Sequence, residues 1–266
     1  MKLFVSADIE GTCGIVNWNE TEKNHPDHAW FANQMSREAG AAAQGAIDAG
    51  WDVLVKDAHD SARNILPELL PRQAELIRGW IWDLRCMIGG ADRETFDAAA
   101  FTGYHSAAFT EGNSLAHTMT TSAYRVLLNG KICSEFMFNA LACARLGIPT
   151  IFLSGDKALC ESAKELIPEI ATVATKEGLG NACRSRHPEV VTEEIRSTLF
   201  QALDPKHVKK CLLKLPKHFV LEISYKETAQ AYRNSFYPGA SLADPKTVVF
   251  ETNDYEEIER AIHFIL

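Results

Sequence analysis

The chain has 266 residues, a length that suits one large α/β domain or two unequal lobes. With 46% hydrophobic and 23% charged residues, its composition is that of an ordinary globular protein and excludes disordered, collagen-like and disulfide-scaffold classes. The 27 basic and 35 acidic residues give a net charge of −8. This charge argues against nucleic acid or an anionic membrane as a partner, because either would attract a basic face.

The seven cysteines are odd in number and show no C-x-x-C spacing, so neither a disulfide framework nor a zinc knuckle is indicated. The first eight residues contain one basic residue, Lys2, and then an acid, Asp8, which leaves no room for the apolar stretch of a signal peptide. No run approaches the roughly 18 apolar residues of a membrane span. We therefore expect a cytoplasmic protein with reduced thiols and no membrane partner.

Short apolar runs alternate with stretches of helical periodicity, a pattern typical of βαβ units around a largely parallel sheet. The strands predicted in this part of the chain span residues 2–7, 52–56, 98–102, 150–153 and 171–174. The helices predicted between them span residues 29–49, 135–146 and 157–166. Each helix ends near a Gly or Pro that stops it. The fold class predicted is α/β, with a three-layer parallel-sheet domain.

Residues 115–128 predict a hairpin, because two apolar arms at 115–119 and 124–128 flank a small polar turn. Asn129 and Gly130 predict a second turn. Beyond residue 190 the pattern restarts with a helix, two strands and a last helix, predicted at 193–202, 219–224, 247–251 and 255–265, with a basic linker at 204–217. We therefore expect a metal-binding catalytic α/β domain over residues 1–190 and a second, smaller C-terminal α/β lobe over residues 191–266.

Two carboxylates stand where the first predicted strand ends. Asp8 and Glu10 are two residues apart, so their side chains point to the same side of an extended chain. Open parallel sheets bind ligands at the carboxyl ends of their strands, which is where both acids lie. Two anions in one place repel each other unless a cation or a proton lies between them. Taken alone, however, such a pair is better explained by a solvated strand end with an incidental pair of acids.

Three further side chains favour a metal site at the same sheet edge. His59 and His105 follow the predicted strands 52–56 and 98–102, and Glu135 stands at a predicted helix start. Each has an ordinary alternative, as a hydrogen-bonded histidine or as an acid that compensates a helix N-terminus. Mixed nitrogen and oxygen ligands from separate strands nevertheless suit Zn²⁺. Together with Asp8 and Glu10 they make five candidates, more than a single catalytic zinc needs, which indicates two metals with a shared carboxylate.

Two rival chemistries are weaker. Residues 11–14, Gly-Thr-Cys-Gly, match neither G-x-G-x-x-G nor the G-x-x-x-x-G-K-[ST] phosphate loop. Cys13 and Cys133 lie near the expected site, but neither has an adjacent histidine in the sequence. A buried, small apolar role explains both cysteines better than a nucleophilic one.

Five dispersed motifs in order resemble the zinc-dependent D-aminopeptidase family, whose founding member belongs to a dipeptide-transport operon. They are SADIEG at residues 6–11, DAHDS at 57–61, GYH at 103–105, AHTM at 116–119, and GKICSE at 130–135 followed by Asn139 and Ala140. The resemblance is dense from residue 1 to about residue 175. It continues more loosely to the C-terminus through residues 219–222 and 247–251.

The resemblance implies a role for each candidate ligand. By it, Asp8 bridges two zinc ions, Glu10 and His105 complete the coordination of one ion, and His59 and Glu135 complete that of the other. The family assembles as a decamer of two stacked pentameric rings with the active sites facing an interior channel. A homo-oligomer with two zinc ions per chain is therefore implied here.

The resemblance also matches His117 to the family's catalytic histidine, which serves as an acid/base or as a donor to the oxyanion. The function expected is that of a dizinc aminopeptidase that hydrolyses an N-terminal D-amino acid of the D-Ala type from short peptides. Two alternatives stay open. A dimetal phosphoesterase would use the same ligands but normally adds basic residues for phosphate, and only Lys56, Arg63 and Arg125 lie near the motifs. A non-catalytic metal- or peptide-binding protein would have no need of His117.

Overall fold

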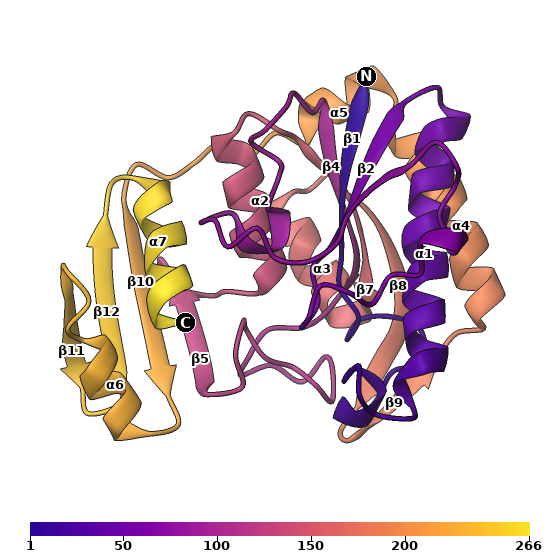
Figure 1. The fold of residues 1–266 in the computed structure, drawn as a ribbon. Coiled ribbons are helices and arrows are strands. Elements are labelled where there is room, and N and C mark those ends of the chain that lie inside the picture. The colour runs from indigo at the N-terminus through magenta and orange to yellow at the C-terminus, as the bar shows by residue number, and fades with distance from the viewer.

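A twisted seven-stranded sheet forms the centre of the larger lobe (Figure 1). The computed structural model describes all residues from 1 to 266. The strands of this sheet are β1 (Lys2–Ala7), β2 (Asp52–Asp57), β3 (Glu75–Ile77), β4 (Ala98–Tyr104), β7 (Thr150–Asp156), β8 (Ala171–Leu179) and β9 (Ala182–Ser185). Their order is β3-β2-β1-β4-β7-β8-β9, and every neighbouring pair is parallel except β8 and β9.

Helices cover both faces of this sheet and make the three layers that the sequence predicts. They are α1 (His28–Asp48), α2 (Glu135–Arg145), α3 (Lys157–Leu166), α4 (Pro188–Ala202) and the short α5 (Pro205–Lys210). In Figure 1, α1 and α4 lie side by side on one face, and α2 and α3 lie on the other. Strands covered on both faces are buried along their whole length, as all seven residues of β4 and of β7 are.

The contact between α1 and α4 depends on a residue without a side chain. A Cβ atom at Gly45 would lie 2.6 Å from the carbonyl oxygen of Arg196 in α4. This part of α1 is otherwise made of small, buried side chains, the alanines at positions 39, 41–43 and 46. Small residues therefore let α4 pack closely on α1, and together the two helices shield one face of the sheet.

The smaller lobe is built on a five-stranded antiparallel sheet. Its elements are β5 (Ala123–Leu128), β6 (Lys131–Ile132), β10 (Phe219–Tyr225), β11 (Ala240–Asp244), β12 (Thr247–Thr252), α6 (Thr228–Asn234) and α7 (Tyr255–Ile265). The strand order is β11-β12-β10-β5-β6. Figure 1 shows α7, which ends at the C-terminus, on the side of this sheet that faces the larger lobe. The predicted α/β class with a second, smaller lobe is confirmed.

The predicted hairpin over residues 115–128 is wrong in its first arm. Only residues 123–128 form a strand, β5, and its partners are β6 and β10 rather than residues 115–119. Residues 115–119 run as an irregular loop in which Thr118 accepts from the backbone of Ala108 and donates to the carbonyl of Cys133. The apolar residues 115–119 predict a strand, but the strand that pairs with β5 is β10, from a distant segment of the chain. The second turn is present, with Asn129 and Gly130 in the left-handed region at φ 52° and 75°.

Several short elements lie outside the sequence predictions. The segment expected as a linker at 204–217 contains α5, and β3, β9, β11 and α6 had no predicted counterpart. The largely exposed residues of β9 and β11 explain why hydrophobic periodicity does not reveal those two strands.

Neither lobe is built from one continuous stretch of the sequence. α4 packs on α1 and β8 in the larger lobe, and β5 and β6 reach the smaller sheet from the middle of the sequence. The division of the chain into two domains at residue 190 therefore stays a prediction.

None of the helices combines the length and the apolar character needed to cross a bilayer. All seven cysteines are free thiols.

Candidate metal centre

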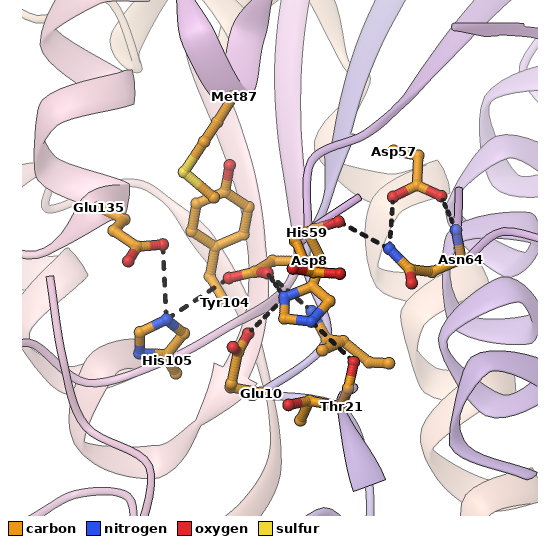
Figure 2. Close-up of polar contacts among 12 residues, drawn as sticks. Asp8, Glu10, Thr21, Asp57, His59, Asn64, Met87, Tyr104, His105 and Glu135 are labelled. Atoms are coloured by element: carbon orange, nitrogen blue, oxygen red, sulfur yellow. Dashed lines mark hydrogen bonds and ion pairs between the residues drawn. The ribbon is translucent and has the colours of Figure 1, made fainter. Parts of the chain in front are cut away.

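The carboxyl ends of β1, β2 and β4 bring the predicted ligands together at one edge of the large sheet (Figure 2). β1 lies between the other two strands and continues their ladders past its end. Asp8 donates its backbone N–H to Thr102 at 2.9 Å, and Ala58 donates to Ala7 at 2.8 Å. These bonds hold the segments after the strands in register, so Asp8, His59 and His105 emerge side by side.

Two glycines in the sequence motifs allow this close approach. A Cβ atom at Gly11 would lie 1.7 Å from the carbonyl oxygen of Tyr104, and one at Gly103 would lie 2.2 Å from that of Asp8. Gly103 also has φ 69°, a left-handed conformation that side chains disfavour. The backbone N–H of Gly11 donates to Gly103 at 2.8 Å. Any larger residue at either position would push the β1 and β4 ends apart and separate the ligands.

Asp8 stands between two pairs, each made of one carboxylate and one imidazole. His59 Nδ1 lies 3.3 Å from Asp8 Oδ1 and 3.2 Å from Glu10 Oε2. On the other side, His105 Nε2 lies 3.5 Å from Asp8 Oδ2 and 3.4 Å from Glu135 Oε2. All five side chains are buried. The structure thus brings together every ligand predicted from the sequence.

Three overlapping groups of donors each have their ligand atoms within 4.8 Å of one another. One joins Asp8, Glu10 and His59, a second joins Asp8, His105 and Glu135, and a third joins Glu10, His105 and His117. His59 and Glu10 lie on one side of the β1 end, whereas α2 delivers Glu135 from the side of β4. The assignment of Glu10 and His105 to one ion, and of His59 and Glu135 to the other, stays a prediction.

The donor set fits metal ions better than it fits a hydrogen-bond network. Asp8 Oδ2, Glu10 Oε2 and His105 Nε2 are buried and have no hydrogen-bond partner. Ligand atoms at the 2.0–2.2 Å typical of tetrahedral zinc lie about 3.3–3.6 Å from one another. The separations of 3.2–3.5 Å within each group are of this size. Buried polar atoms that converge without bonding to each other are the arrangement that cations satisfy.

The other nitrogen of each histidine is held by a backbone carbonyl. His59 Nε2 lies 3.0 Å from the carbonyl of Thr21, and His105 Nδ1 lies 2.9 Å from that of Ser106. A carbonyl accepts a hydrogen bond only from a nitrogen that carries a proton, so in the neutral ring that would bind a metal the opposite nitrogen is the one with the lone pair. Metal-binding histidines in proteins are oriented in this way.

The buried carboxylates of Asp8, Glu10 and Glu135 need positive charge nearby to compensate their negative charge. Burial raises the pKa of Asp8 to about 8, and the nearby Glu10 adds to the rise. Burial would also raise the pKa of Glu10, but His59 outweighs it and holds that pKa well below its usual value. Burial would lower the pKa of His105, yet the charge of Glu135 raises it to about 10. In the metal-free chain, protonated imidazoles therefore supply the positive charge that bound ions would bring.

A second ring of buried side chains, not predicted from the sequence, fixes the loops that carry the ligands. Asp57 accepts from the backbone of Asn64 and Ile65, which shapes the loop after His59. Lys176 donates to the carbonyl of Glu10 at 2.6 Å. Asp156, at the end of β7, accepts from the backbone of Ser106 at 2.7 Å. The strand-end rule that pointed to the ligands also applies to Asp156, whereas the position of Lys176 within β8 gives no signal.

His117 lies on the loop between β4 and β5 rather than on a hairpin arm. Its Nε2 is 3.5 Å from Glu135 Oε1, and its Nδ1 is 2.9 Å from the carbonyl of Leu115. It is more exposed than the ligands, at 14% of its side chain, and Trp18 packs edge-on against it at 5.2 Å between centroids. His117 is thus oriented like a ligand but stands at the solvent side of the cluster.

A cavity of about 470 Å³ opens onto this cluster. Its walls come from the β2–β3 loop, the segment around η3 (Cys86–Ile88), the loop of His117 and the end of α7. Three tryptophans line it, Trp18, Trp80 and Trp82, and no lysine or arginine does. A cavity of this size beside a polar cluster suits a small ligand.

Comparison with known proteins agrees with the geometry. The model of the D-aminopeptidase family, peptidase M55, matches residues 1–264. A D-aminopeptidase of Bacillus subtilis (strain 168) is 29% identical over 265 residues, covering 98% of this chain and 95% of the relative. The solved structure of the Zn-dependent D-aminopeptidase DppA from Bacillus subtilis, a self-compartmentalizing protease, superposes with a TM-score of 0.90 at 28% identity, over 98% of this chain and 95% of that one. The chain therefore belongs to the peptidase M55 family of D-aminopeptidases and is an aminopeptidase.

Proposed function

We propose that this chain is a dizinc aminopeptidase that releases an N-terminal D-amino acid, of the D-Ala type, from short peptides. Asp8 would bridge the two ions, Glu10 and His105 would complete the coordination of one, and His59 and Glu135 would complete that of the other. One observation carries the proposal: buried carboxylate and imidazole donors converge around Asp8, whose two oxygens face different imidazoles at 3.3 and 3.5 Å.

Zinc as the metal rests on the donor set and on the similar structure. Mixed imidazole and carboxylate ligands suit Zn²⁺, and DppA is Zn-dependent. Two of the three donor groups share Asp8, which supports two ions per chain. When bound, the ions would polarise the scissile carbonyl and lower the pKa of a water molecule so that hydroxide forms near neutral pH.

His117 supplies the proton transfer in this proposal. Its Nδ1 is held by the Leu115 carbonyl, so Nε2 faces the cavity wall at Glu135 and is the atom that exchanges a proton. In that position it protonates the leaving amine or donates a hydrogen bond to the oxyanion. The packing of Trp18 against the ring limits access of water from one side.

The cavity lining favours a peptide over a phosphate ester. Phosphate is normally gripped by arginine or lysine, and neither residue type lines this cavity. Lys56, the nearest candidate in the sequence, instead donates to the carbonyl oxygens of Asp57 and Gly79. Aromatic and aliphatic walls beside the metal ligands suit the side chains of a short peptide.

The proposal extends to assembly and location. DppA is described as self-compartmentalizing, and a chain with this fold and family would likewise form a homo-oligomer, a decamer of two pentameric rings, in the cytoplasm. Multi-angle light scattering of the purified protein tests the oligomer. A monomer at micromolar concentration would refute the assembly without affecting the chemistry.

Metal analysis combined with a paired activity assay tests the function. We expect two zinc ions per chain, hydrolysis of D-Ala-D-Ala and no comparable hydrolysis of L-Ala-L-Ala. A chelator should abolish the activity and zinc should restore it. Undiminished turnover of metal-free protein would contradict the metal mechanism, and a preference for the L-dipeptide would contradict the stereochemistry.

A further inference from the structure

One acidic side chain in the wall of the cavity has no partner in the protein. Five acidic residues line the cavity, and three of them, Asp8, Glu10 and Glu135, belong to the metal cluster. Of the other two, Asp83 accepts from the backbone of Arg85 at 3.1 Å and lies 4.0 Å from Arg93. The carboxylate of Asp60 makes no hydrogen bond and no ion pair, and Asp60 directly follows the ligand His59 in the chain.

The backbone around Asp60 is firmly held although the side chain is exposed. Asp60 has φ 43°, a left-handed conformation that only glycine, asparagine and aspartate adopt readily. The indole N–H of Trp80 donates to the carbonyl of Asp60 at 2.6 Å. Ala62 donates to His59 at 2.7 Å and closes the turn. The loop thus holds Asp60 in the wall of the cavity, directly after the candidate ligand His59 in the chain and with its carboxylate unpaired.

We propose that Asp60 binds the α-ammonium group of the peptide substrate and so makes the enzyme select free N-termini. This inference rests on the proposed function. In any peptide the α-nitrogen lies about 2.5 Å from the carbon of the first carbonyl, as two bonds of standard length require. A partner for that ammonium must therefore stand next to the groups that hold the metals, and an anionic acceptor forms a strong, charge-assisted bond with it.

Trp80 acts as a positioning residue for Asp60. The Nζ of Lys56 lies 4.5 Å from the centroid of the Trp80 ring and also donates to the carbonyl of Gly79 at 3.2 Å. This buried lysine fixes the tryptophan, whose indole N–H in turn fixes the Asp60 backbone. Because Lys56 is engaged by carbonyl groups and the ring, it leaves the Asp60 carboxylate free for a substrate cation.

The test compares Asp60→Asn with Asp83→Asn in the zinc-loaded enzyme. Asparagine keeps the shape of aspartate and tolerates the left-handed backbone, so only the charge is lost. Asp60→Asn should raise KM for D-Ala-D-Ala by about tenfold or more, the worth of a hydrogen bond to a charged group, with kcat within about threefold. Its zinc content should equal that of the wild type. Asp83→Asn should keep KM within about threefold.

Trp80→Phe, which removes the indole donor, should raise KM in the same direction but less than Asp60→Asn does. An unchanged KM in Asp60→Asn, or an equal rise in Asp83→Asn, would overturn the assignment. A fall in kcat with unchanged KM would overturn it as well, because it would place Asp60 in the chemical step.

A binding measurement separates this inference from the proposed function. D-Alaninol carries the ammonium group but no scissile carbonyl, and propane-1,2-diol replaces the amine with a hydroxyl. In ligand-observed NMR titrations, the zinc-loaded wild type should bind D-alaninol more tightly than the diol, and Asp60→Asn should lose that preference. A wild type that cleaves no D-peptide refutes the proposed function, whereas equal binding of the two ligands refutes the role of Asp60.

Discussion

The imidazole rings of His105 and His117 are stacked, with centroids 4.4 Å apart and an angle of 12° between their planes. Both rings also face Glu135, His105 through Oε2 at 3.4 Å and His117 through Oε1 at 3.5 Å. One carboxylate therefore contacts a buried histidine of the candidate metal centre and a more exposed histidine. This arrangement couples the orientation of His117 to the metal cluster without requiring His117 to coordinate an ion.

His117→Ala should retain two zinc ions and the fold but lose about 10²- to 10⁴-fold in kcat on D-Ala-D-Ala, the usual cost of removing an acid/base group. Glu135 keeps its bond from the Met119 backbone at 2.7 Å, so the ligand stays in place. Zinc content and steady-state kinetics measure the two effects. Loss of zinc would make His117 a ligand, and normal turnover would end its catalytic assignment.

Asp8→Asn should be the most damaging single change to the ligands. The two oxygens of Asp8 face His59 on one side and His105 on the other, and an amide cannot offer a second anionic oxygen. We expect zinc content to fall below one ion per chain and activity to disappear, as measured by metal analysis and the dipeptide assay. Glu10→Gln is the matched comparison, because it should weaken only one of the two sites. Normal binding of both ions by Asp8→Asn would show that Asp8 does not bridge.

The cysteines near the site should be dispensable. Burial raises the pKa of the Cys13 thiol to about 11 and that of Cys133 well above its ordinary value, so both are protonated and poorly nucleophilic at neutral pH. Cys13→Ala and Cys133→Ala should each keep kcat/KM within about tenfold of the wild type, or about 1.4 kcal/mol of barrier. If alkylation of either thiol stops catalysis while the circular dichroism spectrum stays native, that cysteine would have a nucleophilic role.

Glu38 should make the stability depend on pH. Burial raises its pKa to about 7, and the bonds from the Cys13 backbone and Gln34 only partly offset that rise. The folded state then binds this proton more tightly than the unfolded state does, so the contribution of Glu38 to stability is present at low pH and is lost between about pH 4.5 and pH 7.

Glu38→Gln removes this titration. The free energy of unfolding of the variant, relative to wild type, should rise by up to about 3 kcal/mol between about pH 4.5 and pH 7 and stay level above that range. Urea unfolding in the presence of chelator measures it without interference from zinc. A difference between the two proteins that does not change with pH would contradict the raised pKa.

The sequence by itself determined which residues reach the site. Apolar runs and their breaks locate β1, β2 and β4, and a parallel sheet places the ends of such strands at one edge, so Asp8, His59 and His105 could be predicted as neighbours. The start of α2 likewise placed Glu135. The positions of these residues follow from local hydrophobic periodicity and from the direction of each strand, and both can be read from the sequence.

Only the tertiary structure decided how these residues combine. Which carboxylate faces which imidazole depends on side-chain directions set by the packing of loops, so the 3.2 Å contact between Glu10 and His59 had to be seen. Lys176 reaches Glu10 from β8, and β5 pairs with β10 from the far end of the chain. Such contacts join segments about 100 residues or more apart, and no local pattern records them because long-range pairing is set by the whole fold.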